Sequence, residues 1–417
     1  MFGKRNEYAY FCNMFNNQTR NGMRKKQLSI LVLMLMVSLA SWAQMSGSCG
    51  DGLNYNAETK DGGKTYTLTI SGSGWMKSYD YWASPDPVLP GWSEIREKIT
   101  SVVVGEGVLS VGNQAFNECK TLTSVILPST LQHIGSDAFF DCFALESVSL
   151  PEGLMEMNNS AFFECKSLKS VVIPSSLTYI ANYAFGSCVS LESVTLPSTV
   201  TSIGERAFDY CLKLTDVTLP SGLLSIGGWA FSDTAMPSVV IPGGVKNVSA
   251  AAFTRNPNLT TLVVSEGVET IGLGTFGVCP QLTTIVLPST LNRIDDYAFM
   301  AWQKIKDFYC YASNVPETGD EIFMISYDEG YPDDLSGATL HVPAGSVTKY
   351  KNKAPWNSFG SIVALTSDDP TPSDISEISV QNTEDTGVYY TIDGIRLQGQ
   401  PTQKGLYIKD GKKVLVQ

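Results

Sequence analysis

Nine phenylalanines recur at nearly constant spacing through the middle of this chain of 417 residues. Successive members lie 23 residues apart, except for a single step of 22 residues. A fixed period in this range predicts a solenoid, in which each turn is a short unit stacked on the next. Solenoids present long repetitive surfaces, so the period also favours binding over catalysis. These ladder phenylalanines are Phe116, Phe139, Phe162, Phe185, Phe208, Phe231, Phe253, Phe276 and Phe299.

One period, residues 122–144, shows how a turn is built. The run L-x-x-V-x-L, with Leu122, Val125 and Leu127 facing inward, predicts a short strand with one buried face. Pro128 ends this strand because proline has no N–H to give to a sheet. A second extended piece follows, and Phe139 then turns the chain back and fills the space between the two layers. The pattern predicts two parallel strand layers around a phenylalanine core.

A single turn cannot bury its apolar residues, but a stack of turns can. Each buried phenylalanine contributes about 1.5–3 kcal/mol against the entropy lost on ordering the chain. We therefore predict a β-rich solenoid of about ten turns of 23 residues each over residues 99–304. Residues 44–98 and 305–365 carry aromatic stretches and are expected to cap its ends, since an open end needs a cover.

The C-terminal region continues beyond the expected cap. Residues 366–374 form a polar, proline-containing linker. Residues 375–417 carry two alternating segments, 388–397 and 405–416, with tight turns predicted at Asp393-Gly394 and Asp410-Gly411. A segment of this size is too small for a robust independent domain, so an address or anchor role is favoured.

Residues 23–43 have the features of a secretory signal peptide: a basic head, an apolar run and a small-x-small site at Ser41-Trp42-Ala43. The apolar run is too short for a stable membrane span. We predict cleavage near Ala43, export of the chain and no transmembrane span in the mature protein. Residues 1–22 would then be an upstream extension. A lipid anchor at Cys49 is disfavoured, because no leucine stands three residues before it.

The charge of the mature chain excludes one class of partner. Residues 1–43 hold six of the 29 Lys and Arg and one of the 41 Asp and Glu, so the mature charge is 23 minus 40, or -17. A chain this acidic repels phosphate backbones, and nucleic-acid binding would need a basic stripe. We therefore predict no nucleic-acid partner.

Six cysteines follow the same period, each three residues after a ladder phenylalanine. A metal or disulfide array is one interpretation. The other, which we favour, is a stack of small buried thiols. Thr234, Asn256 and Trp302 fill the same position in other turns, so it does not require sulfur. The six are Cys119, Cys142, Cys165, Cys188, Cys211 and Cys279.

Residues for catalysis or metal binding are sparse. The two histidines, His133 and His341, are far apart, and no second ligand accompanies His133 in its own turn. Carboxylates at 295–296 and 320–321 could meet across turns, but solvated charge is the favoured interpretation. We predict no enzyme activity, no cofactor and no metal site.

The repeat resembles a known family. The pattern L-x-x-V-x-L-P-x-x-L-x-x-I-G-x-x-A-F-x-x-C, with the entry at residues 101–116 and the exit at 340–350, resembles the BspA-like leucine-rich repeat proteins of Bacteroidetes. The segments 389–397 and 404–416 are similar to short type IX sorting domains. The resemblance implies a secreted or surface-displayed, adhesin-like protein, and some family members bind host matrix proteins.

Two surfaces are candidates for binding. The first is an uncharged strand ribbon in the outward column of the first strands, which either reflects β-propensity alone or docks a partner. The second is an aromatic edge near the ladder phenylalanines, whose rings either contact a ligand or pack on one another. The ribbon candidates are Val103, Ile126, Val172, Val240, Val263 and Val286. The edge candidates are Phe140, Phe163, Tyr183, Trp229 and Tyr297.

The sequence thus predicts a non-enzymatic, exported binding protein of the cell surface, with a host protein or a glycan as its ligand. A self-associating envelope scaffold is the alternative from the structural class. A carbohydrate-active enzyme is a weaker alternative, because no acid/base pair stands at a defined spacing. A regular repeat encodes the rod and leaves the identity of the ligand to scattered surface residues.

Overall fold

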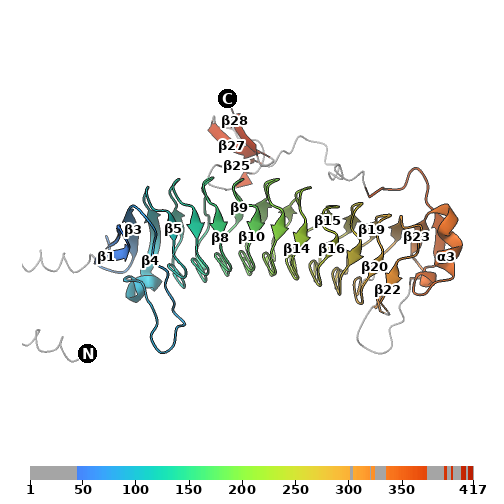
Figure 1. Cartoon of the computed structure of the whole chain (residues 1–417), viewed down its shortest axis with the longest axis horizontal. Helices are drawn as coiled ribbons and strands as arrows, with labels where there is room; N and C mark the ends of the chain where they lie inside the picture. Colours follow the sequence, from blue (N-terminus) through green and yellow to red (C-terminus); the bar gives the residue numbers. More distant parts are fainter. Residues whose placement is uncertain are drawn as a thin grey trace, which may run out of the picture.

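The computed structural model describes residues 45–300, 304–319, 321–324 and 335–372, together with the backbone of four short strands between residues 389 and 416. The predicted signal peptide and the extension before it lie outside these residues. Within the described chain the protein is a β-solenoid of about 11 turns of roughly 23 residues, which confirms the predicted fold. Figure 1 shows the turns stacked along one axis, with β1 at one end and α3 at the other.

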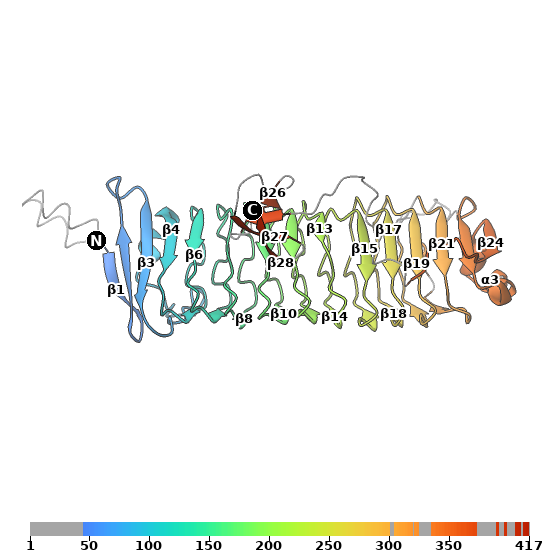
Figure 2. The same ribbon diagram turned by 90° about the horizontal axis from the view of Figure 1, so that it is seen from above.

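Each turn has three sides. The first face and the second face carry short parallel strands, and the turn edge carries the ladder phenylalanine with its neighbours from two residues before to four after. The first face contains β4 (Ile99–Val104), β6 (Ser124–Ile126), β9 (Ser170–Val172), β11 (Ser193–Thr195), β13 (Asp216–Val217), β15 (Ser238–Ile241), β17 (Thr261–Val264), β19 (Thr284–Leu287), β21 (Asp307–Cys310), β23 (Thr339–Val342) and β24 (Ser361–Ala364). Its strands run side by side in Figure 2.

The second face is built from two-residue strands, one in most turns. They are β5 (Ser110–Val111), β7 (His133–Ile134), β8 (Glu156–Met157), β10 (Tyr179–Ile180), β12 (Ser202–Ile203), β14 (Ser225–Ile226), β16 (Asn247–Val248), β18 (Thr270–Ile271), β20 (Arg293–Ile294) and β22 (Glu317–Thr318). Equivalent residues pair from turn to turn, as in Ile180 with Ile203. The register keeps like residues in columns along the rod.

Both faces are interrupted at the same two places. Among the described strands, the first face is divided after β6 and again between β13 and β15, and the second face after β8 and between β14 and β16. The second interruption coincides with the single 22-residue step of the ladder. Cys211 and Leu214 are three residues apart, whereas Thr234 and Met236, their equivalents in the next turn, are two apart. One missing corner residue therefore accompanies the loss of pairing on both faces.

The ladder phenylalanines form one continuous stack in the core. Neighbouring ring centroids are 5.1–5.9 Å apart with interplanar angles of 4–22°. All nine are at most 1% exposed. Trp92 extends the stack at one end, 5.6 Å from Phe116, and Phe323 extends it at the other, 6.1 Å from Phe299. Stacked rings fill the space between the two strand layers, as the sequence predicted.

The cysteine position is a buried hydrogen-bonding site. Cys188 Sγ donates to the Phe162 carbonyl oxygen at 3.2 Å, and Cys142, Cys165, Cys211 and Cys279 repeat this bond in their own turns. Burial raises the pKa of Cys188 to about 12, so the thiol stays protonated at neutral pH. These contacts bear out the packing interpretation of the cysteine ladder.

Different caps close the two ends. At the N-terminal end β1 (Met45–Gly50), β2 (Leu53–Glu58) and β3 (Tyr66–Gly72) form antiparallel pairs, and β3 runs parallel to β4. The 3-10 helix η1 (Ser93–Lys98) leads into β4. At the C-terminal end η2 (Ala344–Ser346), α3 (Val347–Lys351) and η3 (Trp356–Ser358) cover the last turns. There the fully buried rings of Tyr350 and Trp356 pack 5.3 Å apart.

The described part of the C-terminal tail is a four-stranded antiparallel sheet in the order β26-β25-β27-β28. Its strands are β25 (Tyr389–Thr391), β26 (Arg396–Leu397), β27 (Gly405–Lys409) and β28 (Lys412–Val416). Each of the two predicted alternating segments therefore contains two short strands instead of one. The predicted turns at 393–394 and 410–411 lie outside the described residues.

Candidate binding surface

The strand ribbon is not one exposed surface. Ile126 is 60% exposed, and Val103, Val172 and Val240 are half-buried. Val263 and Val286 are each 1% exposed, so the prediction that they face outward to solvent is wrong. Pairing places Val240, Val263 and Val286 in one column, as predicted. The alternating pattern correctly predicted which residues share a column, but it did not predict that two of them are buried.

Towards the C-terminal end of the rod, the column of Val286 is covered by residues of the chain itself. Tyr309 and His341 follow Val286 in register, and their rings stack 4.4 Å apart. After β24 the chain folds back, so that Pro370 O accepts a hydrogen bond from Tyr311 Oη at 3.2 Å. Asp369 Oδ2 lies 3.8 Å from His341 Nδ1. The described part of the expected linker thus packs on the first face, which removes this end of the ribbon from the candidate surface.

The turn edge has an unusual backbone. Within the described residues, every non-glycine residue with positive φ lies two positions before or two after a ladder phenylalanine, at φ values of 52–61°. This left-handed conformation costs about 1–2 kcal/mol per residue. Hydrogen bonds to the next turn hold it: Tyr183 N donates to Glu205 O at 2.9 Å and Ser187 N donates to Asp209 O at 2.7 Å. Side chains in these two columns are therefore fixed on the turn edge.

Aromatic rings meet along the N-terminal half of this edge. Phe140 and Phe163 stack with centroids 5.3 Å apart, and Phe163 meets Tyr183 at 6.0 Å. The guanidinium of Arg206 lies 5.9 Å from the Tyr183 ring centre and 4.9 Å from that of Trp229. Trp82, from the N-terminal cap, meets Phe140 edge-on at 5.9 Å. We call this row the aromatic strip: Trp82, Phe140, Phe163, Tyr183, Arg206 and Trp229.

Four of the five predicted edge residues belong to the strip. Phe140, Phe163 and Tyr183 pack on one another, and all four are only partly buried, so packing is observed and ligand contact stays a prediction. Tyr297 lies outside the strip, since Ala251 and Gly274 separate it from Trp229 in the same column. Sequence reasoning missed Arg206, although it occupies the column of Tyr183 and Trp229. It also assigned Trp82 to capping, whereas Trp82 is 56% exposed.

Gly186 lies where the aromatic strip passes from the column one residue after the ladder phenylalanine to the column two residues before it. It stands one residue after Phe185, the position that Phe140 and Phe163 fill in earlier turns. A Cβ at Gly186 would lie 2.9 Å from the ring of Phe163, closer than ring carbons allow. The missing side chain lets Phe163 lean toward Tyr183, and so joins the two columns of rings.

Charged groups flank the strip on the turn edge. Burial, and to a lesser extent the neighbouring carboxylate of Glu164, raise the pKa of Asp141 to about 6. Lys166 Nζ lies 4.1 Å from the ring centre of Phe143 and 2.9 Å from Glu164 Oε2. Cations and carboxylates alternate here, so the flanks offer donors and acceptors without a dominant charge.

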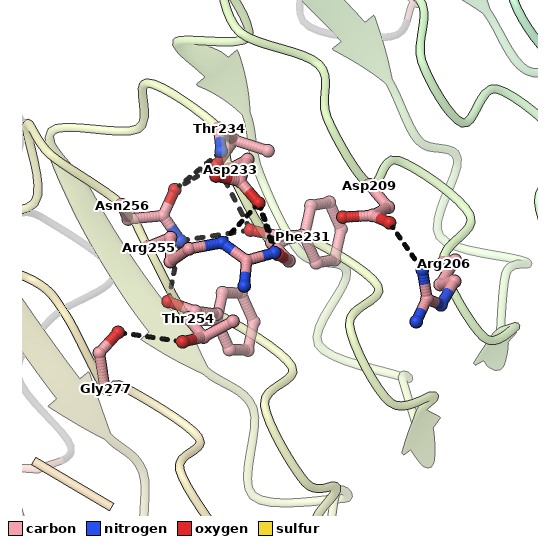
Figure 3. Close-up of polar contacts among 11 residues, drawn as sticks. Arg206, Asp209, Phe231, Asp233, Thr234, Thr254, Arg255, Asn256 and Gly277 are labelled. Carbon is pink, nitrogen blue, oxygen red and sulfur yellow. Dashed lines mark hydrogen bonds and ion pairs between the residues drawn. The ribbon is translucent and has the colours of Figure 1, made fainter. Parts of the chain in front are cut away.

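A polar network follows the strip, where both strand faces are interrupted for the second time (Figure 3). Arg255 Nε donates to Asp233 Oδ2 at 2.7 Å, which joins two successive turns. Asn256 Nδ2 donates to the carbonyls of Phe231 and Phe253 at 3.0 and 2.7 Å, and Thr234 Oγ1 donates to Asn256 Oδ1. Thr234 and Asn256 occupy the cysteine position, so this network replaces the thiol bonds at the short corner.

The residues weighed for catalysis or metal binding are not brought together. His133 Nδ1 lies 3.2 Å from Glu156 Oε2, and its ring contacts that of Trp75 at 4.7 Å. Asp295 Oδ1 pairs with Arg293 Nε at 2.6 Å, while Asp320 lies outside the described residues. No group of three metal-ligating side chains occurs in the described chain.

The family described as "BspA type Leucine rich repeat region" matches residues 95–215 and 201–327, more than half of the 417 residues. The chain belongs to this family. As a BspA-type protein it has a leucine-rich repeat region over most of the solenoid. The Bacteroidetes lineage and the sorting role of the tail remain predictions.

Three solved structures are similar to the BspA-type chain. A leucine rich cell surface protein from Faecalibacterium prausnitzii is 22% identical, with 78% of this chain and 96% of that chain covered and a TM-score of 0.39. A leucine-rich repeat protein from Bacteroides ovatus is 19% identical, with 76% and 99% covered and a TM-score of 0.36. The pneumococcal vaccine antigen PcpA is 14% identical, with 77% and 98% covered and a TM-score of 0.34.

No curated protein matches the chain. In the part of the chain that the structure describes, no helix is both long enough and apolar enough to cross a membrane.

Proposed function

We propose that this BspA-type protein is a non-enzymatic binding protein of the cell surface, and that the aromatic strip is its ligand-binding site. The ligand is a protein or a glycan outside the cell. Export rests on the signal peptide predicted at residues 23–43, with cleavage near Ala43. A non-enzymatic role is supported by the matching family, whose description names a repeat region and no reaction.

One observation carries the proposal: half-exposed rings from successive turns meet in a single row. Phe140, Phe163 and Tyr183 make consecutive contacts of 5.3 and 6.0 Å along the turn edge. Rings held in place by their neighbours lose little rotamer freedom when a ligand covers them, which favours binding. The core needs none of these rings, since the ladder phenylalanines already fill it.

The test measures binding of the full chain to arrays of extracellular-matrix proteins and of glycans. The variant Phe163→Ser/Trp229→Ser removes two rings of the strip, and we expect it to lose a saturable signal by a factor of about 30 or more. Tyr297→Ser is the matched control, because Tyr297 occupies the column of Trp229 but lies outside the strip. Equal loss in the control and the double variant would contradict a site on the strip.

If the wild-type chain bound nothing on either array, that result would contradict the proposed function itself. Self-association at micromolar concentration, measured by sedimentation in the same samples, would then favour the envelope scaffold instead. Turnover of a polysaccharide on the glycan array would revive the enzyme alternative.

A further inference from the structure

The N-terminal cap carries a loop that the repeat does not explain. Residues 80–90 form a hairpin closed by two backbone hydrogen bonds, from Asp80 N to Val88 O at 2.8 Å and from Val88 N to Asp80 O at 2.9 Å. Tyr79 and Trp92, just outside the loop, are buried and their rings pack 5.7 Å apart. We call residues 80–90 the braced loop. Figure 1 shows it in blue, projecting from the first turns.

The braced loop exposes apolar side chains instead of burying them. Trp82 is 56% exposed, Val88 54% and Leu89 45%, and Pro85 and Pro87 are exposed between them. Large apolar groups gathered on a projecting loop mark an interaction site in soluble proteins. Because the hairpin and the prolines already order the loop, binding would cost little further conformational entropy.

The loop is joined to the aromatic strip. Tyr81 N donates to Gln114 Oε1 at 2.7 Å, and Arg96 lies 5.1 Å from the Tyr81 ring centre, so the base of the loop is fixed on the first turn. Trp82 contacts Phe140 at 5.9 Å. Trp82 therefore connects the braced loop, which also exposes Val88 and Leu89, to the aromatic strip.

Within the braced loop both charged residues, Asp80 and Asp86, are acidic and exposed. Arg96, at the base of the loop, is paired with Glu118 Oε2 at 3.0 Å. A partner that places cations beside apolar side chains is complementary to this surface. Aliphatic side chains such as Val88 and Leu89 give no hydrogen bonds to sugar hydroxyls, whereas they pack well on the apolar side chains of a protein.

We infer that the partner is a protein segment that combines aromatic or aliphatic side chains with lysine or arginine, and that it docks on the braced loop and the adjoining end of the aromatic strip. This inference rests on the proposed function and assigns the partner class and the first point of contact. Trp82 and Leu89 act as apolar anchors, and Asp80 and Asp86 provide the complementary charge.

The probe is a displayed library of random 12-residue peptides, selected on the full chain and then measured as single synthetic peptides by calorimetry. We expect enriched peptides to carry an aromatic or aliphatic residue close to Lys or Arg. Trp82→Ser/Leu89→Ser should weaken their binding by a factor of about 30 or more. Asp80→Asn/Asp86→Asn should weaken it by a factor of about 3 and reduce its salt dependence.

Four outcomes would overturn the inference. Enriched peptides without basic residues would exclude a cationic partner. Unchanged affinity in Trp82→Ser/Leu89→Ser would exclude the braced loop as the docking site. Loss of glycan or phosphatidylcholine-vesicle binding in that variant, without selection of any peptide, would assign the loop to another partner class. Loss of binding in Phe163→Ser/Trp229→Ser with full binding in the loop variant would leave the proposed function standing and reject only the loop. Thermal unfolding of each variant checks that the fold is intact.

Discussion

The core position of each turn keeps the same residue type along the rod, whereas the neighbouring position on the turn edge varies, although the two are only one or two residues apart in the chain. In the core, the ladder phenylalanine recurs in nine turns and is almost fully buried in every one. One residue later, the successive residues are Asn117, Phe140, Phe163, Gly186, Asp209, Ser232, Thr254, Gly277 and Met300. The first column is constrained by stacking on both sides, whereas the second accepts rings, glycines, a carboxylate and polar side chains, among them the buried Asn117 and Ser232.

This contrast indicates which positions can determine the ligand. A column that must fill the core in every turn specifies the fold and carries no information about a ligand. A column that changes from ring to glycine to carboxylate gives a surface specific to this chain. The aromatic strip arises because Phe140 and Phe163 in this column lie beside Tyr183 and Trp229 in the column two residues before the ladder phenylalanine.

The largest effect should come from the core. Phe185→Ala removes a ring stacked on Phe162 and Phe208 at 5.5 and 5.6 Å, and should lower the free energy of unfolding by about 3–5 kcal/mol. Chemical denaturation measures it. Phe163→Ala, on a half-exposed ring of the edge, should cost about 1 kcal/mol. Similar losses for the two variants would break the distinction between core and edge.

Alkaline pH should also act on the core. Burial raises the pKa of Cys119, Cys188 and Cys279 to about 12 from 9.0. A raised folded-state pKa stabilises the protein below pH 9, and this stabilisation is lost as the pH rises from 9 toward 12. At pH 10 each such thiol should lower the free energy of unfolding by about 1 kcal/mol. Melting temperatures between pH 8 and 11 test this, and a flat profile would contradict it.

A single thiol bond is a finer probe of the core. Cys188→Ala removes one of two hydrogen bonds to the buried carbonyl of Phe162, which keeps the bond from Cys165 N at 3.3 Å, and should lower the free energy of unfolding by about 1 kcal/mol. Cys188→Ser keeps a donor at this position and serves as the matched control. If serine is as destabilising as alanine, packing of the sulfur and not its hydrogen bond holds the position.

The smallest effect on stability should come from the strip. Arg206→Met keeps the length of the side chain but removes the charge near Tyr183 and Trp229, and should change the free energy of unfolding by about 0.5–1 kcal/mol. Ligand binding on the strip should fall much more than stability. A loss of stability equal to that of a core variant would show that the strip is part of the structural framework.

The sequence predicted the solenoid, the buried phenylalanines and the thiol packing, because these depend on a period that local chemistry repeats many times. It missed the burial of Val263 and Val286, because alternation identifies an outward column and says nothing about what covers it. It also missed Trp82 and Arg206. Their roles come from contacts with Phe140 and Trp229, which only the stacking of turns creates.

The two interruptions of the strand faces have a mechanical consequence. At both places the turn edge stays bonded: Phe162 N donates to Ala184 O at 2.9 Å across the first, and Phe231 N donates to Ala252 O at 2.8 Å across the second. We expect bending of the rod at these two places to open or close the strand faces more than the turn edge, which places this edge near the neutral axis of bending. The spacing of rings along the aromatic strip should then depend little on the curvature of the rod.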